Sequence, residues 1–447
     1  MEEHIIPTDK SLKSYWFFIS GQLVSLFGSS VVQFAIIWWL TVTSKADPNY
    51  ENRTGTILGL ASVAGFAPFV ITSLFAGVLV DRWNRKLVIA IADAFQALFT
   101  GILMILFYYD KAELVYVLLI LAVRSVAQGF HSPATAAIIP LLVPKNKLTK
   151  VNSVENIFNS TVSLIGPIVG AVLVEVIGVE NMAAILWIDI ITFIIAVFPV
   201  LIISIPDITK KKREQKENSF SSEFKEGVSF IKNQDGLLSL LTTFTVLNIM
   251  ITPVFVLLPL VIIDPSLING NASTLAIFMV ITQIGAIIGA FKLTKGQLFH
   301  TNAKGVAFGQ ALLYVGMFTI IVSLIMSNVY ILYLGGFING IGLPISNVPS
   351  QTIWQSVVPP ELQGRVMSVR MAIAWTMIPV SQLVGGIISD IIGPIKLFTG
   401  ALFIGLSFLI FAWFMTGFSR VEITLGLSDP VLDERIPDKS DTPLSSN

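Results

Sequence analysis

The chain has 447 residues, of which 54% are hydrophobic and 13% are charged, and its formal net charge is zero. Soluble globular chains carry about 25% charged residues, so this composition excludes an ordinary soluble protein. A net charge of zero gives no field that would attract nucleic acid, and the lack of cysteine excludes disulfides, thiolate metal sites and cysteine nucleophiles.

Long apolar runs alternate with short charged or Pro- and Gly-rich breaks. A helix needs about 20 apolar residues to cross a bilayer, and the chain offers twelve such runs. The sequence therefore predicts an all-α integral membrane protein with twelve transmembrane helices. In chain order the expected spans are 14–42, 55–80, 87–109, 113–142, 152–177, 183–205, 237–263, 273–298, 305–327, 329–357, 366–391 and 395–418.

Basic residues are unevenly shared between the two alternating sets of loops. One set holds Arg82, Arg85, Lys86, Lys145, Lys147, Lys150, Lys210, Lys211, Lys212, Arg213, Lys216, Lys292, Lys295, Lys304, Arg365 and Arg370. The other set holds only Lys45, Arg53, Lys111 and Lys396. Because lysine and arginine resist translocation, both termini and the 206–236 loop are expected on the cytoplasmic side of a bacterial-type plasma membrane.

A constant offset of 215 residues relates the two halves of the chain. It pairs Val143 with Val358, Pro144 with Pro359, Lys150 with Arg365, Gly170 with Gly385, Glu175 with Asp390 and Gly178 with Gly393. Parallel repeats of this kind are typical of transporters built from two six-helix bundles.

The repeat predicts four regions: a six-helix bundle at 1–205, a cytoplasmic linker at 206–236, a second six-helix bundle at 237–420 and a cytoplasmic polar tail at 421–447. Within the linker, Phe224, Val228 and Ile231 recur at helical spacing, which indicates a helix on the inner membrane surface. The alternative is a plain tether.

The ionisable residues inside apolar spans include Arg124, Asp93 and Asp189. Arg124 lies about 15 Å from the outer end of its span, near the bilayer centre. Such residues are costly in a bilayer and are functional by default, so we predict these three as a candidate proton and charge relay. The alternative is that each is a structural group satisfied by a neighbour. For Glu155, near the interface, we prefer that alternative.

The fifth span contains Gly166, Pro167 and Gly170, and the eighth contains Gly285 and Gly289. Small residues four apart let another helix approach closely, and proline weakens the helix locally. We expect the fifth-span group to form a deformable contact between the two halves, the alternative being ordinary helix packing.

These residues resemble motifs of the major facilitator superfamily, in its drug:proton antiporter type and most closely its bacterial macrolide-efflux branch. The resemblance covers nearly the whole chain. The loop motif matches at Gly77, Asp81, Arg82, Arg85 and Lys86, with Asn84 where the family usually has glycine. The antiporter motif matches at Gly166, Pro167 and Gly170, with Ala171 replacing a second glycine. The fourth-span motif resembles Arg124, Gln128 and Gly129, with one extra residue after the arginine, and the branch's late loop matches residues 358–366.

The resemblance implies a monomeric secondary transporter that works by alternating access in the lipid bilayer and exports amphipathic or lipophilic small molecules in exchange for protons. It implies that the loop motif is a conformational latch, in which Asp81 faces the start of the eleventh span. We expect the first, fourth, seventh and tenth spans to line the cavity, with Gln22, Gln33, Asn248, Asn339 and Asn347 as candidate lining residues.

Other functions remain open. A siderophore exporter or a lysolipid transporter would share the fold, and a channel or a membrane sensor would belong to a different class. The three histidines, His4, His131 and His300, lie far apart, and no nucleotide-binding or nucleophile motif is present. We therefore expect no enzyme activity, no cofactor and no metal site.

Overall fold

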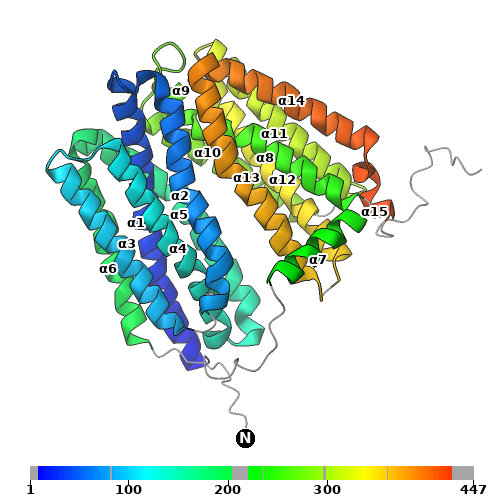
Figure 1. Cartoon of the computed structure of the whole chain (residues 1–447), viewed down its shortest axis with the longest axis horizontal. Helices are drawn as coiled ribbons and strands as arrows, with labels where there is room; N and C mark the ends of the chain where they lie inside the picture. The colour runs from blue at the N-terminus through cyan, green and yellow to red at the C-terminus, as the bar shows by residue number, and fades with distance from the viewer. Residues whose placement is uncertain are drawn as a thin grey trace, which may run out of the picture.

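The computed structural model describes residues 9–80, 83–203, 220–234, 236–294, 299–359 and 361–424. These residues are almost entirely helical and form two bundles (Figure 1). Twelve of the described helices are long and apolar enough to cross a membrane, which confirms the all-α, twelve-helix prediction.

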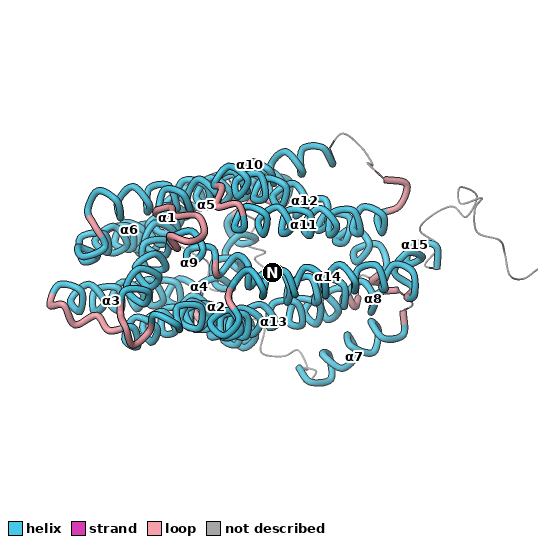
Figure 2. The backbone as a smooth tube through the Cα atoms, turned by 90° about the horizontal axis from the view of Figure 1, so that it is seen from above, coloured by secondary structure: helices cyan, strands magenta, loops and turns pink. Residues whose placement is uncertain are grey.

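The N-terminal half forms the first bundle and the C-terminal half forms the second (Figure 1, Figure 2). The first bundle contains α1 (Asp9–Ala46), α2 (Thr54–Val80), α3 (Arg85–Tyr108), α4 (Leu114–Leu142), α5 (Leu148–Ile177) and α6 (Met182–Ile202). The second contains α8 (Leu237–Val256) with its continuation α9 (Leu258–Ile263), α10 (Ala272–Thr294), α11 (Asn302–Ile325), α12 (Val329–Val357), α13 (Gln363–Ile392) and α14 (Pro394–Met415). The shorter helices α7 (Phe220–Asn233) and α15 (Val421–Thr424) flank the second bundle.

The sequence repeat is also a repeat of helix boundaries. Both ends of α12 carry numbers 215 higher than the ends of α4, and the same holds for α13 and α5. The residues that follow α5 and α13 are Gly178 and Gly393, with φ of 87° and 85° and ψ of 150° and 153°. A side chain is strained at such positive φ, so the two glycines end equivalent helices in the same way.

Local chemistry explains several helix ends. The side chain of Asn84 accepts a hydrogen bond from the Leu87 N–H at the start of α3, and Asn328 does the same for Tyr330 and Ile331 at the start of α12. The seventh span, expected as one helix over 237–263, is interrupted at Leu257. Pro259 accounts for the interruption because it has no N–H to continue the hydrogen-bond ladder.

The glycines of the fifth span pack inside the first bundle. A Cβ at Gly166 would lie 2.2 Å from Ser30 Oγ, and one at Gly170 would lie 2.8 Å from the Val31 carbonyl oxygen. Both contacts are to α1. The prediction that these glycines form a contact between the two halves is therefore wrong. Gly166 and Gly170 have no side chains, and this allows α5 to pack closely against α1. Gly285 and Gly289 likewise face α12 within the second bundle.

The linker helix α7 packs against protein. Ile231 is 2% exposed, and the Arg365 carbonyl oxygen lies 2.9 Å from where a Cβ at Gly227 would be. Arg365 at the start of α13 also pairs with Glu226 at 2.5 Å. The sequence predicted that the apolar face of this helix would contact the membrane surface, whereas it is largely covered by α13. Residues 206–219 and 235 of the predicted linker, and residues 425–447 of the predicted tail, lie outside the described residues.

Candidate functional site

A buried ion pair lies inside the first bundle. Arg124 Nη2 of α4 lies 2.6 Å from Asp189 Oδ2 of α6, and the Asp189 side chain is fully buried. Ser29 of α1 donates a hydrogen bond to Asp189 Oδ1 at 2.8 Å, and Thr100 of α3 donates one to Oδ2 at 3.0 Å. The guanidinium also lies over the Phe193 ring, 5.9 Å from its centroid. We call Ser29, Thr100, Arg124 and Asp189 the arginine layer.

A second polar group lies beside it. Gln22 Nε2 of α1 donates to Asp93 Oδ2 of α3 at 3.2 Å, and His131 Nε2 of α4 lies 3.2 Å from Asp93 Oδ1. The same histidine nitrogen lies 2.8 Å from Gln22 Oε1. We call Gln22, Asp93 and His131 the histidine layer.

The two layers are stacked on the same three helices. The pairs Gln22 and Ser29 on α1, Asp93 and Thr100 on α3, and Arg124 and His131 on α4 are each seven residues apart. Seven residues are about two helical turns, so each pair lies on one helix face and the layers are about 10 Å apart. The histidine layer lies nearer the end of the bundle at which α1 begins.

Both layers open on a cavity of about 350 Å³ inside the first bundle. The wall includes the predicted residues Gln22, Gln33, Asp93 and Arg124, together with His131. Asp189 is not among the lining residues and is linked to the cavity through Arg124 and Ser29, which both line it. The structure thus places the three predicted relay residues in one polar region, split between two separate groups.

The other predicted lining residues belong to the second bundle. Asn248 of α8 is half-buried, with its amide nitrogen 3.5 Å from the Ala374 carbonyl oxygen, and Asn347 of α12 is exposed. Asn339 is 1% exposed and packs against Gly316 of α11, inside the second bundle. Glu155 accepts a hydrogen bond from the Tyr15 hydroxyl, which is the structural role we preferred for it.

Arg85 and Lys86 of the loop motif bind helix ends within the first bundle. Lys86 Nζ donates to the carbonyl oxygens of Leu201 and Ile203 at 2.7 and 2.8 Å, at the end of α6. Arg85 donates to the Ala137 carbonyl oxygen at 3.0 Å, in the last turns of α4. These carbonyls carry partial negative charge, which favours a cation. Gly77 belongs to α2, while Asp81 and Arg82 lie outside the described residues.

The two bundles are joined at the end where α1 finishes and α2 begins, which we call the closed end. Asp390, near the end of α13, accepts hydrogen bonds from the Gly55 N–H (2.9 Å), the Thr56 N–H (2.7 Å) and the Thr56 hydroxyl (2.6 Å). Glu175, near the end of α5, accepts bonds from the Ser273 N–H (2.8 Å) and hydroxyl (2.7 Å). Each acid therefore occupies the N-terminus of a helix of the other bundle, where free N–H groups and partial positive charge favour an anion.

A salt bridge adds to these contacts, because Lys45 Nζ of α1 lies 2.5 Å from Asp264 Oδ2, just after α9. Burial raises the pKa of the Asp264 carboxyl, but hydrogen bonds from Lys45 and Ser266 outweigh burial and leave the pKa lower than usual. The pair is therefore ionised at neutral pH and is lost only as pH falls through that lowered value. We call Lys45–Asp264, Glu175–Ser273 and Asp390–Thr56 the seam. Away from the seam the two bundles diverge toward the end at which α1 begins, the open end (Figure 1).

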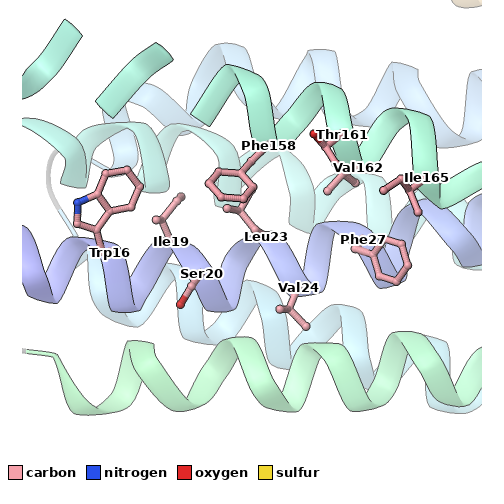
Figure 3. A pocket seen from close by; sticks show the side chains of 10 residues that line it. All are labelled: Trp16, Ile19, Ser20, Leu23, Val24, Phe27, Phe158, Thr161, Val162 and Ile165. Carbon is pink, nitrogen blue, oxygen red and sulfur yellow. The ribbon is translucent and has the colours of Figure 1, made fainter. Parts of the chain in front are cut away.

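A separate apolar groove of about 360 Å³ lies between α1 and α5, away from both polar layers (Figure 3). Figure 3 shows Trp16, Leu23 and Phe27 of α1 beside Phe158 and Ile165 of α5, and Ser20 and Thr161 are the only hydroxyl side chains in its lining. This groove has none of the ionisable groups that the polar cavity contains.

Sequence reasoning did not identify His131, Glu175 or Asp390 as site residues. The signal for His131 is its position two helical turns after Arg124, on the same face. The signal for the two acids is that the 215-residue repeat pairs them at equivalent helix ends. Among the described residues, no group of three or more His, Asp or Glu side chains has the arrangement of a metal site.

Comparisons with known proteins agree with this geometry. The chain is 30% identical over 378 residues to Macrolide efflux protein A of Streptococcus pyogenes, covering 84% of this chain and 89% of that protein. It is 23% identical to the Staphyloferrin A transporter of Staphylococcus aureus, covering 86% of this chain and 91% of that one. The crystal structure of a D-xylose-proton symporter superposes with a TM-score of 0.66 at 13% identity, covering 91% of this chain and 99% of that chain. Residues 18–379 match the model of the Major Facilitator Superfamily, and this chain therefore belongs to that family of transporters.

Proposed function

We propose that this transporter exports macrolide-like amphipathic small molecules and that proton entry drives the export. The observation that carries the proposal is the 30% identity to Macrolide efflux protein A over 84% of this chain. The two buried polar layers support proton coupling, because ionisable groups inside membrane helices mark ion and proton pathways.

The distribution of basic residues supports an orientation in a bacterial plasma membrane with both termini in the cytoplasm. In that orientation the open end faces inward and the seam closes the outer side. We further propose that Gly77, Asp81, Arg82, Arg85 and Lys86 form the latch of the opposite, outward-open conformation. The transporter would act as a monomer, with Gln22, Gln33, Asn248 and Asn347 lining the path of the substrate and Asn339 joining them only in another conformation.

The test is an accumulation assay in bacteria that lack their own efflux pumps. Cells expressing the chain should contain severalfold less radiolabelled erythromycin than cells with an empty vector, and a protonophore should abolish the difference. If the difference survives the protonophore, proton coupling is wrong. If accumulation never differs for erythromycin or for a panel of other amphipathic drugs, the substrate class is wrong.

A siderophore exporter is the second candidate, favoured by the similarity to the Staphyloferrin A transporter. Siderophores are polar and iron-chelating, unlike macrolides, so the two candidates separate cleanly. If this candidate is correct, secretion of a citrate-type siderophore into iron-poor medium should depend on expression of the chain. Drug accumulation should then be the same with and without the chain.

A further inference from the structure

The two carboxylates inside the first bundle are held in different ways. Asp189 receives three hydrogen bonds of 2.6–3.0 Å, one of them from the permanently charged Arg124. Such donors stabilise the ionised carboxylate. Protonating Asp189 would leave the buried guanidinium without a counter-ion. Asp189 is therefore poorly suited to take up and release a proton.

Asp93 has weaker and uncharged neighbours. Its two described contacts are both 3.2 Å long, one to the neutral amide of Gln22 and one to His131, whose own charge depends on protonation. Asp93 is 1% exposed, so an ionised carboxylate there needs a nearby positive charge. Only a protonated His131 supplies that charge within the histidine layer.

The contacts of His131 define where the exchanging proton resides. Its Nε2 faces two acceptors, Gln22 Oε1 at 2.8 Å and Asp93 Oδ1 at 3.2 Å, so Nε2 carries a hydrogen in this arrangement. Gln22 is orientated by the same contacts, with its Nε2 toward Asp93 and its oxygen toward His131. The proton that is gained or lost is then on His131 Nδ1 or on an Asp93 oxygen.

The surroundings favour a single exchangeable proton. Arg124 of α4 and Asp189 of α6 neutralise each other about 10 Å from the histidine layer. On the open-end side, Lys86 of α3 and Glu155, the partner of Tyr15 of α1, lie about as far away, two helical turns from Asp93 and Gln22. From α1 and α2, the cavity wall next to the layer contains only neutral groups, such as Ser25 and Gly65. Without the extra proton the Asp93–His131 pair has a charge of −1, and with it the pair is neutral.

The layer also has access to water. The His131 side chain is 12% exposed and the Asp93 side chain 2%, and both line the 350 Å³ cavity. The layer lies on the open-end side of the arginine layer. In the present conformation, a proton on His131 can leave toward the open end, while the arginine layer and the seam lie between it and the closed end.

We propose that Asp93 and His131 together bind the coupling proton, that Gln22 positions them, and that the Arg124–Asp189 pair is a fixed, permanently ionised part of the wall. This assignment rests on the proposed proton-coupled export. One proton is added to the Asp93–His131 pair from the outer side and released from it on the inner side, and no other bond changes.

The test uses the purified full chain in proteoliposomes, with radiolabelled erythromycin as the probe. Two reactions are measured: accumulation driven by an imposed pH gradient, and exchange of labelled for unlabelled erythromycin without a gradient. Asp93→Asn and His131→Gln keep the approximate size of the side chains, and each removes one of the two members of the proton-binding pair. Each should reduce gradient-driven accumulation about tenfold or more, keep exchange within about threefold, and make exchange independent of pH. His300→Gln, the same change outside the membrane spans, should leave both reactions unchanged.

The other outcomes decide against the assignment. If the wild type exchanges erythromycin but its accumulation does not respond to the pH gradient, proton coupling itself is wrong, and so is the assignment of Asp93 and His131. If the wild type responds to the gradient and both variants do so equally, the coupling proton binds elsewhere. If folded variants lose both reactions to the same extent, the histidine layer binds substrate or supports structure instead. The double variant Arg124→Gln with Asp189→Asn should retain the pH dependence of exchange, whatever its rate. If only this double variant lost the pH dependence, Asp189 would be the group that binds the coupling proton.

Discussion

At the scale of single residues, the structure separates charged groups that the sequence could only place together. Arg124, Asp93 and Asp189 stand out in the sequence because charges are rare in apolar spans. Their partners could not be predicted, because pairing depends on how α3, α4 and α6 are rotated against one another. His131 was missed because its one signal in the sequence, a position two helical turns after Arg124, acquires meaning only when α1, α3 and α4 are assembled around it.

The Arg124–Asp189 pair leads to a stability prediction. Asp189→Asn would leave a buried guanidinium without its counter-ion, which costs about 3–5 kcal/mol. We expect a clear loss of thermal stability in detergent, measured by fluorescence-detected size-exclusion chromatography after heating. Replacing both partners by apolar side chains, Arg124→Met with Asp189→Leu, should recover most of the loss. Asp110→Asn, the same change at an exposed loop acid, should have no effect, and a double variant as unstable as the single one would contradict the ion-pair explanation.

At the scale of helices, the sequence predicted most elements closely. The tenth span, expected at 329–357, coincides with α12, because charges, prolines and glycines at the breaks interrupt the apolar pattern. Contacts between helices were harder to predict. The glycines of the fifth span face α1 rather than the other half, and the apolar face of α7 packs against α13. In both cases the pattern shows that a face is buried without showing against what.

The α1–α5 contact can be tested by adding one carbon. A Cβ at Gly166 would lie 2.2 Å from Ser30 Oγ, so Gly166→Ala should push the helices apart and destabilise the protein by about 1–3 kcal/mol. Adding Ser30→Gly should restore most of that stability. The matched control is Gly101→Ala on α3, where no atom lies within 4 Å of the new Cβ, and where better helix propensity should make the change neutral or slightly stabilising. An unaltered melting temperature for Gly166→Ala would show that the contact is looser than described.

At the scale of the whole molecule, the 215-residue repeat predicted the two bundles, and the helix boundaries follow it residue by residue from α4 to α5. The seam could not be predicted in the same way. Glu175 and Asp390 look like ordinary loop-end acids in the sequence. Their partners are backbone N–H groups, which leave no mark in a sequence, and one hydroxyl each, from Ser273 and Thr56, which is too common a group to identify a partner.

The seam predicts how the conformational equilibrium responds to substitution. An acid at a helix N-terminus contributes about 0.3–1 kcal/mol when exposed, as Glu175 is, and up to about 2 kcal/mol when partly buried, as Asp390 is. Asp390→Asn should therefore increase the population of the conformation in which the closed end has opened by up to about thirtyfold, and Glu175→Gln by up to about fivefold. The two effects should add in the double variant. Because the chain has no cysteine, spin labels can be attached specifically at Asn49→Cys and Tyr330→Cys. Double electron–electron resonance between these labels would measure the distance across the closed end.

Glu180→Gln, a change at an exposed acid five residues after Glu175, is the matched control and should leave the distance distribution unchanged. If neither seam variant populates a longer distance, with or without substrate, these contacts do not hold the closed end together.

The reciprocal form of the seam has a consequence for the symmetry of the chain. Glu175 of the first half caps α10 of the second, and Asp390 of the second half caps α2 of the first. In an isologous dimer of identical subunits, every contact occurs twice in this crossed manner. The two halves of this chain therefore meet at the closed end as two subunits of such a dimer would, except that one contact uses a glutamate and the other an aspartate.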